Sequence, residues 1–278
     1  MNNYERLIEV GNSIEGPQSV IMAGVHGHER AGIEAFELIL PTLKIERGRV
    51  LFVYGNPRAI GENKRFTEAD LNRMFVSDDE LSSKDKESYE YGRAQELKPI
   101  LRQAEVLLDL HGTNNPNSEV FAIGESNGRE IVEQLLVEIF VTGLDPIQPG
   151  GTDYFMNMEG NVGICMECGY NKDIESTGRA KEAILAFLGA REHIERERVA
   201  NEKPLTVIRV FSMYRTISED YKMAEPFPEF ADLEPGRLIG VDGGIDVRAE
   251  RQSVILFAST LEIKNRGQEA FVLAEHSQ

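Results

Sequence analysis

Cysteine and long apolar runs are scarce in this sequence of 278 residues, which contains only two cysteines. Cys165 and Cys168 lie three positions apart, so they cannot form a disulfide framework for a chain of this size. No apolar run reaches the roughly 20 residues of a membrane-spanning helix. Residues 1–6 also lack the basic and apolar regions of a signal peptide. We therefore expect a cytoplasmic protein without a membrane partner.

Positive charge is scarce as well. Lysine and arginine together number 30, against 47 aspartates and glutamates, which gives a net charge of −17. Such an acidic protein repels phosphate backbones and anionic lipid surfaces, so we expect no nucleic-acid partner. A small molecule is the expected ligand, and a homo-oligomer remains compatible with this composition.

The apolar pattern predicts an α/β fold. Hydrophobic residues make up 41% and charged residues 28% of the chain, the usual globular mix. Through the first two thirds, short apolar runs alternate with longer amphipathic stretches, which is typical of strands interleaved with helices. We expect strands at residues 19–23, 50–54, 105–110, 119–123 and 162–166. We expect helices at residues 29–40, 88–102, 129–140 and 176–197, and a mobile surface loop at residues 78–87.

The clearest change in composition lies near residue 201. There the charged end of the last expected helix runs into Asn201-Glu-Lys-Pro204. Beyond this point no long helix is expected, and Gly and Pro separate short apolar runs that resemble strands. These runs are residues 205–214, 236–241, 253–258 and 270–273. We expect one domain at residues 1–200 and a small all-β domain at residues 201–278.

A glycine-bracketed turn, Gly24-Val-His26-Gly-His28-Glu29, follows the first expected strand and opens a helix. Functional side chains gather at such strand ends in α/β proteins. The three-residue spacing of His26 and Glu29 can bring an imidazole and a carboxylate to one side, as a metal site requires, while His28 points elsewhere. The pair alone is a weak signal, because a helix cap or a solvated charge gives the same pattern.

A third candidate ligand, His111, stands at the end of the strand expected at residues 105–110. With His26 and Glu29 it forms a His2Glu set, which leaves the fourth position of a tetrahedral zinc ion open. Asp109 projects to the same face of the strand and can orient a ligand or a nearby arginine. The alternative is a histidine whose hydrogen bonds are simply satisfied at a strand end. His193, within a charged helix, and the histidine of the C-terminal tail are expected to face solvent.

A cluster of basic residues follows the strand expected at residues 50–54. It consists of Arg58, Lys64, Arg65 and Arg73. Guanidinium groups bind carboxylates through two hydrogen bonds, and a cation near a polarised carbonyl stabilises its developing charge. The cluster therefore suggests an anion site. The alternative, which composition alone favours, is a set of surface cations paired with the neighbouring acids Glu62, Glu68 and Asp70.

One carboxylate ends an otherwise apolar strand. Glu167 lies between Met166 and Cys168, surroundings that do not fit a solvated charge. Desolvation there would raise the pKa of Glu167, which suits a general base acting on metal-bound water. Cys165 and Cys168 also match a Cys-x-x-Cys redox or zinc pair, but a zinc knuckle needs a second pair. We expect both cysteines to be core or supporting residues, with Cys165 on the same side as Glu167.

Five motifs in this order resemble the aspartoacylase and succinylglutamate desuccinylase family of zinc hydrolases. They are His26-x-x-Glu29, Asn56-Pro-Arg-Ala59, Asp70-Leu-Asn-Arg73, Asp109-Leu-His111 and Glu167-x-Gly169. The resemblance covers most of the first 200 residues, and the five ordered motifs make it specific. It implies a zinc carboxypeptidase-like fold, with a mixed sheet flanked by helices in a catalytic domain at residues 1–200. It also implies that the β domain at residues 201–278 packs over the site mouth.

The resemblance further implies a role for individual residues. One zinc ion per chain would be bound by His26, Glu29 and His111. Glu167 would be the general base and Arg65 would polarise the scissile carbonyl. Asn72 and Arg73 would hold the α-carboxylate of the substrate. The complete set of candidate substrate-binding residues is Asn72, Arg73, Arg58, Asn56 and Tyr154.

One departure from the family concerns the substrate. In aspartoacylase, a tyrosine and an arginine before the general base help to bind the side-chain carboxylate, but residues 151–159 contain Tyr154 and no arginine. This argues against N-acetylaspartate. We expect amide hydrolysis of a small anionic N-acyl amino acid or a similar acyl compound. A carboxypeptidase, an esterase and a catalytically silent metal-binding protein are the alternatives, and the presence of Glu167 and Arg65 argues against the last.

Overall fold

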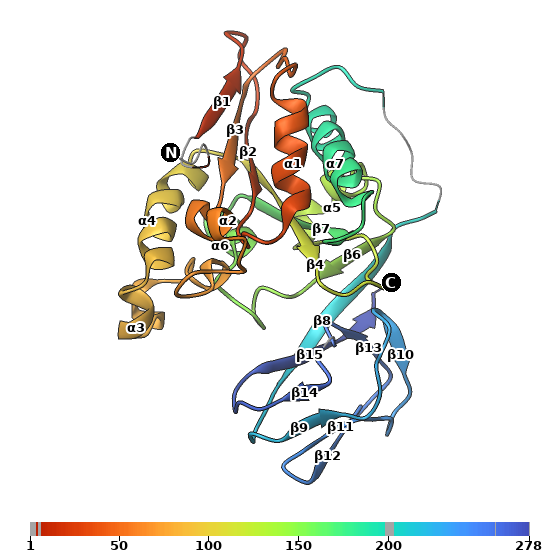
Figure 1. Ribbon diagram of the computed structural model, residues 1–278. Coiled ribbons are helices and arrows are strands. Elements are labelled where there is room, and N and C mark those ends of the chain that lie inside the picture. Colours follow the sequence, from red (N-terminus) through yellow and green to blue (C-terminus); the bar gives the residue numbers. More distant parts are fainter. Residues whose placement is uncertain (1–3, 5–6, 198–202, 259, 278) are drawn as a thin grey trace.

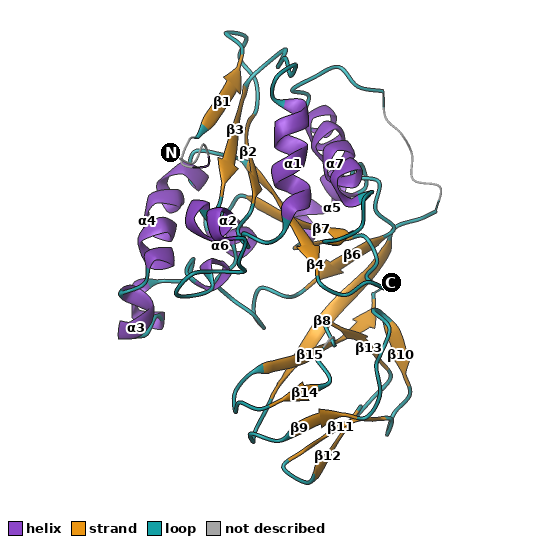
Figure 2. Ribbon diagram, in the orientation of Figure 1, coloured by secondary structure: helices purple, strands orange, loops and turns teal. Residues whose placement is uncertain are grey.

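The computed structural model describes residues 4, 7–197, 203–258 and 260–277, and it combines a helix-flanked sheet with a C-terminal region of strands (Figures 1 and 2). The helices are α1 (Arg30–Ile39), α2 (Pro57–Glu62), α3 (Ser83–Lys86), α4 (Tyr89–Leu101), α5 (Arg129–Val132), α6 (Thr152–Met158) and α7 (Ser176–Ala190). Among the described residues, none of the helices combines the length and apolar composition needed to cross a bilayer.

The strands form one large and one small sheet. In chain order they are β1 (Ile8–Gly11), β2 (Gln18–Ala23), β3 (Arg49–Tyr54), β4 (Val106–Thr113), β5 (Phe121–Gly124), β6 (Ile139–Thr142), β7 (Val162–Tyr170), β8 (Thr206–Arg215), β9 (Tyr221–Met223), β10 (Ala231–Leu233), β11 (Leu238–Asp242), β12 (Ile245–Arg248), β13 (Ser253–Leu256), β14 (Glu262–Ile263) and β15 (Glu269–His276). The large sheet has the order β1-β3-β2-β4-β7-β5-β6-β8-β15-β13-β10, and the small one the order β12-β11-β9-β14.

The large sheet is mixed, as expected. Strands β3, β2, β4 and β7 run parallel to one another, whereas β1 is antiparallel to β3 and β5 is antiparallel to β7. The parallel strands direct their carboxyl ends to one edge of the sheet. That edge is where polar side chains of neighbouring strands can meet.

Helices cover both faces of this parallel part. Figure 1 shows α1 and α7 on one face and α2, α4 and α6 on the other. Strand β2 is apolar on both sides, as a strand between two helical layers must be. Ile21 and Ala23 pack toward α1 and α7, while Val20 and Met22 pack toward α4 and α6. Apart from the helix expected at residues 129–140, the strands and helices predicted for this part of the chain therefore lie where their burial requires.

The C-terminal region continues the large sheet. Strand β8 pairs in parallel with β6 and antiparallel with β15, so the sheet runs without interruption from the helix-flanked part into the C-terminal strands. The four strands expected after residue 204 are confirmed as β8, β11, β13 and β15. The predicted domain boundary between residues 200 and 201 lies outside the described residues, and the division into two domains stays a prediction.

The helix expected at residues 129–140 is wrong after its first turn. α5 ends at Val132, and β6 begins at Ile139. Leu136 between them has a left-handed backbone (φ 60°), which a continuous helix cannot contain. The β-branched and aromatic run of β6 pairs with β5 and β8 instead. Pairing in the sheet thus overrides a helical spacing of apolar residues.

The loop expected at residues 78–87 contains two short helical turns. A 3-10 turn spans Asp78–Glu80, and α3 spans Ser83–Lys86. Each turn begins with a capping box, in which a serine and an acid three positions later satisfy each other's backbone N–H groups. These Ser-x-x-Glu and Ser-x-x-Asp signals are polar, so a search for apolar period alone misses them.

His193 is buried, although its charged neighbours predicted a solvent-facing side chain. Its Nε2 lies 2.9 Å from Ser19 Oγ and its Nδ1 lies 3.1 Å from the carbonyl oxygen of Arg47. Glu192 has a left-handed backbone (φ 55°) and turns the chain after α7, which points the imidazole inward. Burial lowers the pKa of His193. The side chain therefore joins the end of α7 to β2 and to the approach to β3.

Replacing His193 by alanine should remove about 2–4 kcal/mol from the free energy of unfolding, because it leaves two buried polar groups unpaired and opens a cavity. Urea unfolding near neutral pH measures this loss. The matched control is His276→Ala, since His276 is exposed and pairs only with Asp232. A similar small change in both variants would show that the buried contacts of His193 contribute little.

Candidate active site

Three neighbouring strands bring the predicted polar residues to one edge of the sheet. His26 lies in the turn after β2, His111 lies in β4, and Glu167 lies in β7 directly opposite His111 in the parallel register. Glu29 occupies the position before the first residue of α1. The carboxyl ends of β2, β4 and β7 therefore bring these four side chains into one cluster.

The turn that carries His26 and Glu29 is shaped by close backbone packing. The backbone N–H of Glu29 donates to the carbonyl oxygen of His26 at 3.1 Å. At Gly27 an added Cβ would lie only 2.0 Å from the carbonyl carbon of Ala59 in α2. Only glycine fits this contact, and the resulting tight turn directs His26 and Glu29 to the same side.

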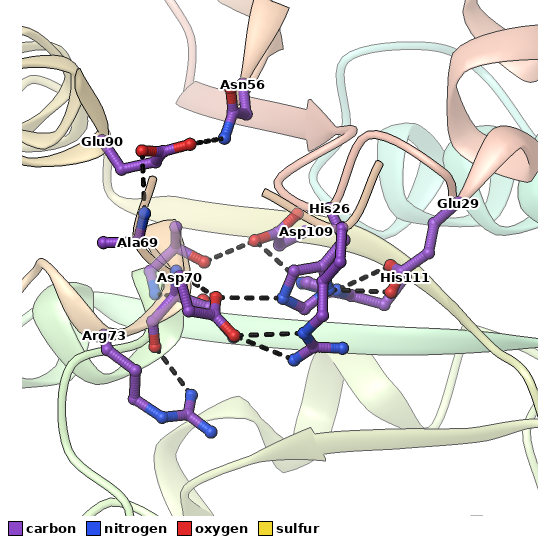
Figure 3. Close-up of polar contacts among 12 residues, drawn as sticks. His26, Glu29, Asn56, Ala69, Asp70, Arg73, Glu90, Asp109 and His111 are labelled. Carbon is purple, nitrogen blue, oxygen red and sulfur yellow. Dashed lines mark hydrogen bonds and ion pairs between the residues drawn. The ribbon is translucent and has the colours of Figure 1, made fainter. Parts of the chain in front are cut away.

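His26, Glu29 and His111 form a compact donor set (Figure 3). Glu29 Oε1 lies 2.7 Å from His26 Nδ1, and Glu29 Oε2 lies 3.1 Å from His111 Nδ1. One ligand atom from each residue lies within 4.8 Å of the others, and all three side chains are buried. The structure thus brings together the three residues predicted to bind metal.

A second carboxylate lies behind each imidazole. His26 Nε2 lies 3.2 Å from Asp70 Oδ1, and His111 Nε2 lies 3.2 Å from Asp109 Oδ2. At His26 this contact is a hydrogen bond, and it favours the tautomer that carries its proton on Nε2 and presents Nδ1 to a metal. At His111 the two atoms form only an ion-pair contact, because Nε2 has no hydrogen-bond partner among the described residues. Asp109 is itself held by the hydroxyl of Thr152, which donates to Oδ2 at 2.5 Å.

This donor set fits a zinc ion. Two imidazole nitrogens and one carboxylate are typical catalytic zinc ligands, and they leave one position for water or substrate. Burial raises the pKa of Glu29, but His26 and His111 outweigh that effect and hold it well below its usual range. Asp109, His111 and Cys165 also lie close together. That group is a poorer metal site, because burial raises the pKa of the Cys165 thiol well above its usual value and opposes thiolate formation.

Glu167 faces the same cavity as the three candidate ligands. Its Oε2 is shielded from solvent and has no hydrogen-bond partner among the described residues. Burial raises the pKa of Glu167 to about 7, although the nearby His111 partly opposes the shift. The predicted desolvation is confirmed, and a carboxylate titrating near neutral pH can accept and return a proton. Cys165 lines the cavity beside Glu167, whereas Cys168 packs in the core, as expected from their spacing.

Two arginines of the basic cluster reach the cavity. Arg65 pairs with Asp70 through Nη2 and Oδ2 at 3.0 Å, so Asp70 joins this guanidinium to His26. Arg73 Nη2 lies 3.0 Å from Glu269 Oε2, a carboxylate of β15. Both alternatives for the cluster are therefore partly correct, because these arginines line a cavity and are also paired with acids.

The cavity has a volume of about 400 Å³, and both parts of the chain form its walls. The helix-flanked part contributes the donor set, Glu167, Arg65, Asn72 and Arg73. The C-terminal part contributes Met213, Glu229, Phe257, Glu269 and Val272. C-terminal strands therefore form part of the cavity wall.

Three predicted substrate-binding residues lie outside the residues that line the cavity. Asn56 caps α2 by accepting from the N–H of Ala59, and it donates to Glu90. Arg58 pairs with Glu68 and stacks over the ring of Tyr89. Tyr154 lies on α6, which directs its neighbour Asp153 to the cavity instead. A direct contact of Asn56, Arg58 or Tyr154 with a ligand has no support in this geometry.

Other lining residues were missed from the sequence. Among them are Asp145, Gln148, Asp153, Glu229 and Glu269. Four of the five lie in loops or in the C-terminal region, where no apolar strand end marks them. Asp153 lies within residues 151–159, where the family resemblance points to a tyrosine and an arginine.

Comparisons with known proteins agree with these features. The family model of the succinylglutamate desuccinylase/aspartoacylase catalytic domain matches residues 15–187. The succinylglutamate desuccinylase of Pseudomonas putida strain GB-1 is 34% identical over 257 residues, covering 82% of this chain and 73% of that protein. The succinylglutamate desuccinylase of Pseudoalteromonas atlantica is 23% identical over 278 residues, covering 88% of this chain and 77% of that protein.

Solved structures show the same fold. The succinylglutamate desuccinylase of Vibrio cholerae superposes with a TM-score of 0.81 at 20% identity, over 97% of this chain and 85% of that one. The enzyme of Vibrio parahaemolyticus gives a TM-score of 0.77 at 18% identity, over 98% and 86% of the two chains. The match of the family model and the 34% identical relative establish more than the fold. The chain belongs to the succinylglutamate desuccinylase/aspartoacylase family.

Proposed function

We propose that this chain is a zinc-dependent hydrolase that cleaves the amide bond of a small N-acyl amino acid. The main support for the proposal is that one cavity contains both a set of metal-binding side chains and a carboxylate that can act as a base. The buried His26, Glu29 and His111 offer three zinc ligands, and Glu167 offers a base with a pKa of about 7. Membership of a family of acyl-amino acid hydrolases supports the same reaction.

Zinc, when bound, supplies Lewis-acid chemistry that activates water and polarises an acyl carbonyl. Glu167 takes a proton from the attacking water and returns it to the departing amine, which suits a carboxylate whose pKa lies near neutral. Arg65 presents its guanidinium to the cavity and stabilises the charge that develops on the carbonyl oxygen. Asp70 holds Arg65 in place through the ion pair described above.

Substrate binding is assigned to Asn72 and Arg73. The carboxylate of the substrate pairs with Arg73 and in doing so competes with Glu269, which holds the same guanidinium. Asn72 is fixed beside it, because its Oδ1 accepts from the N–H of Thr152 at 3.3 Å. Contacts remote from the amide position the scissile bond without reacting themselves. We propose that a small molecule is the ligand of this cavity besides zinc, and that the chain has no nucleic-acid or membrane partner.

The metal site is tested by replacing His111 with alanine. Purified wild-type protein should contain about one zinc ion per chain, as a site with three ligands requires. His111→Ala should lose that zinc in elemental analysis. The control His276→Ala should retain it, because His276 is exposed and pairs with Asp232. Unchanged zinc content in His111→Ala would contradict the assigned ligand set.

The proton-transfer role is tested by Glu167→Gln. Zinc should stay bound, while kcat should fall by about 10² to 10⁴, the usual contribution of a positioned acid or base. Glu159→Gln is the control, since Glu159 lies outside the cavity and pairs with Arg102. Near-normal turnover in Glu167→Gln would eliminate this mechanism even if zinc were found.

The same variant has a pH-dependent effect on the metal-free protein. The pKa of Glu167 is raised from its ordinary value of 4.5 to about 7 on folding, so its contribution to stability is present below about pH 4.5 and is lost as the pH rises through 7. Glu167→Gln should therefore raise the free energy of unfolding by about 1–3 kcal/mol at alkaline pH and hardly change it at acidic pH. Urea unfolding at both pH values measures the difference, and an equal effect at both would show that burial does not shift this pKa.

Carboxylate recognition is tested by Arg73→Ala. The variant should lose activity on an N-acyl amino acid by orders of magnitude, and it should lose much less on the analogue whose carboxylate is amidated. Arg58→Ala is the matched control, because Arg58 pairs with Glu68 outside the cavity. Equal losses on both substrates would assign Arg73 a structural role only.

A further inference from the structure

The cavity contains more negative charge than its positive groups balance. Four carboxylates other than the metal ligand and the base line it, namely Asp145, Asp153, Glu229 and Glu269. Glu269 is neutralised by Arg73 and Arg215, each at 3.0 Å. In the described part of the chain, no lysine, arginine or histidine forms an ion pair with Asp145, Asp153 or Glu229.

Asp153 is the most enclosed of these carboxylates. Its side chain lies in the first turn of α6, is only 7% exposed and faces the cavity. An added Cβ at Gly151 would lie 2.4 Å from Asp153 Oδ1 and 3.5 Å from Asn72 Oδ1. Asp153 therefore lies beside Asn72, within the subsite assigned to the amino-acid part of the substrate.

Asp145 provides a second carboxylate near the first, because it lines the same cavity and is hydrogen-bonded to Asn157, which lies one helical turn after Asp153 in α6. Burial raises the pKa of Asp153 to about 6, and the charge of Asp145 adds to that shift. Among the described residues, the donors that reach the pair are neutral: the amide of Asn157 donates to Asp145 Oδ2 at 2.9 Å, and the backbone of Tyr154 stabilises Asp153. A buried carboxylate without a countercharge is costly, and a cation within the cavity would remove that cost.

The chemistry of the pair points to an organic cation and not to a metal. Neither Asp145 nor Asp153 belongs to a group of three potential metal ligands in the described residues. Two carboxylates at the wall of a cavity that a small molecule enters are well placed to accept hydrogen bonds from an ammonium group. Arg73, the sequence neighbour of Asn72, lines the same cavity and can bind a carboxylate of the same molecule if that carboxylate displaces Glu269.

We propose that the substrate carries an ammonium group as well as its carboxylate, and that Asp145 and Asp153 bind this ammonium group. The proposal rests on the hydrolase function proposed above and narrows its substrate class. The substrate is then an N-acyl amino acid with a basic side chain, which is a zwitterion rather than a net anion. Asp145 and Asp153 determine specificity, while the zinc ligands and Glu167 carry out the reaction.

Three substrates that differ mainly at the end of the side chain test this proposal. They are Nα-acetyl-L-ornithine with a terminal ammonium, Nα-acetyl-L-norvaline without it, and Nα-acetyl-L-glutamate with a carboxylate. For the zinc-loaded protein, kcat/KM should be at least about tenfold higher for the ornithine compound than for the norvaline compound, because a hydrogen bond to a charged group discriminates by roughly that factor. The glutamate compound should be the poorest of the three.

Asp153→Asn should reduce the ratio of the ornithine to the norvaline kcat/KM by about tenfold. Asp145→Asn should also reduce this ratio, and it serves as the second variant if Asp153→Asn does not fold. The control Asp246→Asn should leave the ratio unchanged, since Asp246 lies on β12 and pairs with Arg248. A ratio near one in the wild type, or an unchanged ratio in both cavity variants, would overturn the ammonium subsite while leaving the hydrolase function intact.

Binding distinguishes failure of this subsite from failure of the proposed reaction. Calorimetry with free L-ornithine and L-norvaline should show tighter binding of ornithine, and Asp153→Asn should remove that preference. If none of the three acetylated compounds is hydrolysed but this preference is observed, the hydrolase proposal is wrong for these substrates and the ammonium subsite stands. If neither hydrolysis nor preferential binding is observed, both proposals are overturned.

Discussion

Both carboxylate oxygens of Glu29 are engaged in the interior, Oε1 with His26 and Oε2 with His111 and the backbone N–H of Gly112. A charge this deeply buried is tolerated only where partners surround it, so its position fixes the positions of both imidazoles. The contact also joins the turn before α1 to β4, two segments that are adjacent only because β2 and β4 are neighbours in the parallel sheet. Glu167 of β7 lies opposite His111 of β4 and therefore faces the same cavity.

Asp70 connects the donor set to the basic residues of the cavity. Asp70 contacts His26 on one side and Arg65 on the other, so the same residue orients an imidazole and a guanidinium. Burial raises the pKa of Asp70, but His26 and Arg65 outweigh burial and hold it well below its usual range. A chain with a net charge of −17 thus uses buried acids to position its few cations at the cavity.

The cavity residues that were predicted correctly from the sequence share one property: each stands out from the residues next to it in the sequence. His111 and Glu167 each stand within an apolar strand, where a polar residue has no structural reason to be, and His26 lies in a glycine-bracketed turn after such a strand. Asp145 and Glu269 follow no such pattern. Glu269 meets Arg73 across 196 positions of sequence, and only the assembled sheet brings them together.

The errors in secondary structure have a similar origin. Residues 129–140 carry an apolar spacing that fits a helix, yet Ile139–Thr142 pairs with two strands that local pattern cannot reveal. The charged neighbours of His193 predict an exposed side chain, whereas its burial depends on Ser19 and Arg47 far earlier in the chain. Local patterns therefore identified the residues that gather at the end of the parallel strands, but not most of the residues that form the walls of the cavity.

The continuity of the large sheet limits how this enzyme can be divided. The family model ends at residue 187, but β6 pairs with β8, which begins at Thr206. A fragment that ends after α7 would lack β8, so β6 would pair only with β5 and would become an edge strand. Phe140 and Val141, which are buried in the whole chain, would then lie on an exposed edge of the kind that promotes aggregation. The same cut would remove Phe257, Glu269 and Val272 from the cavity. The region matched by the family model is therefore not a self-sufficient unit, and a truncated or chimaeric protein must also include β8 and β15.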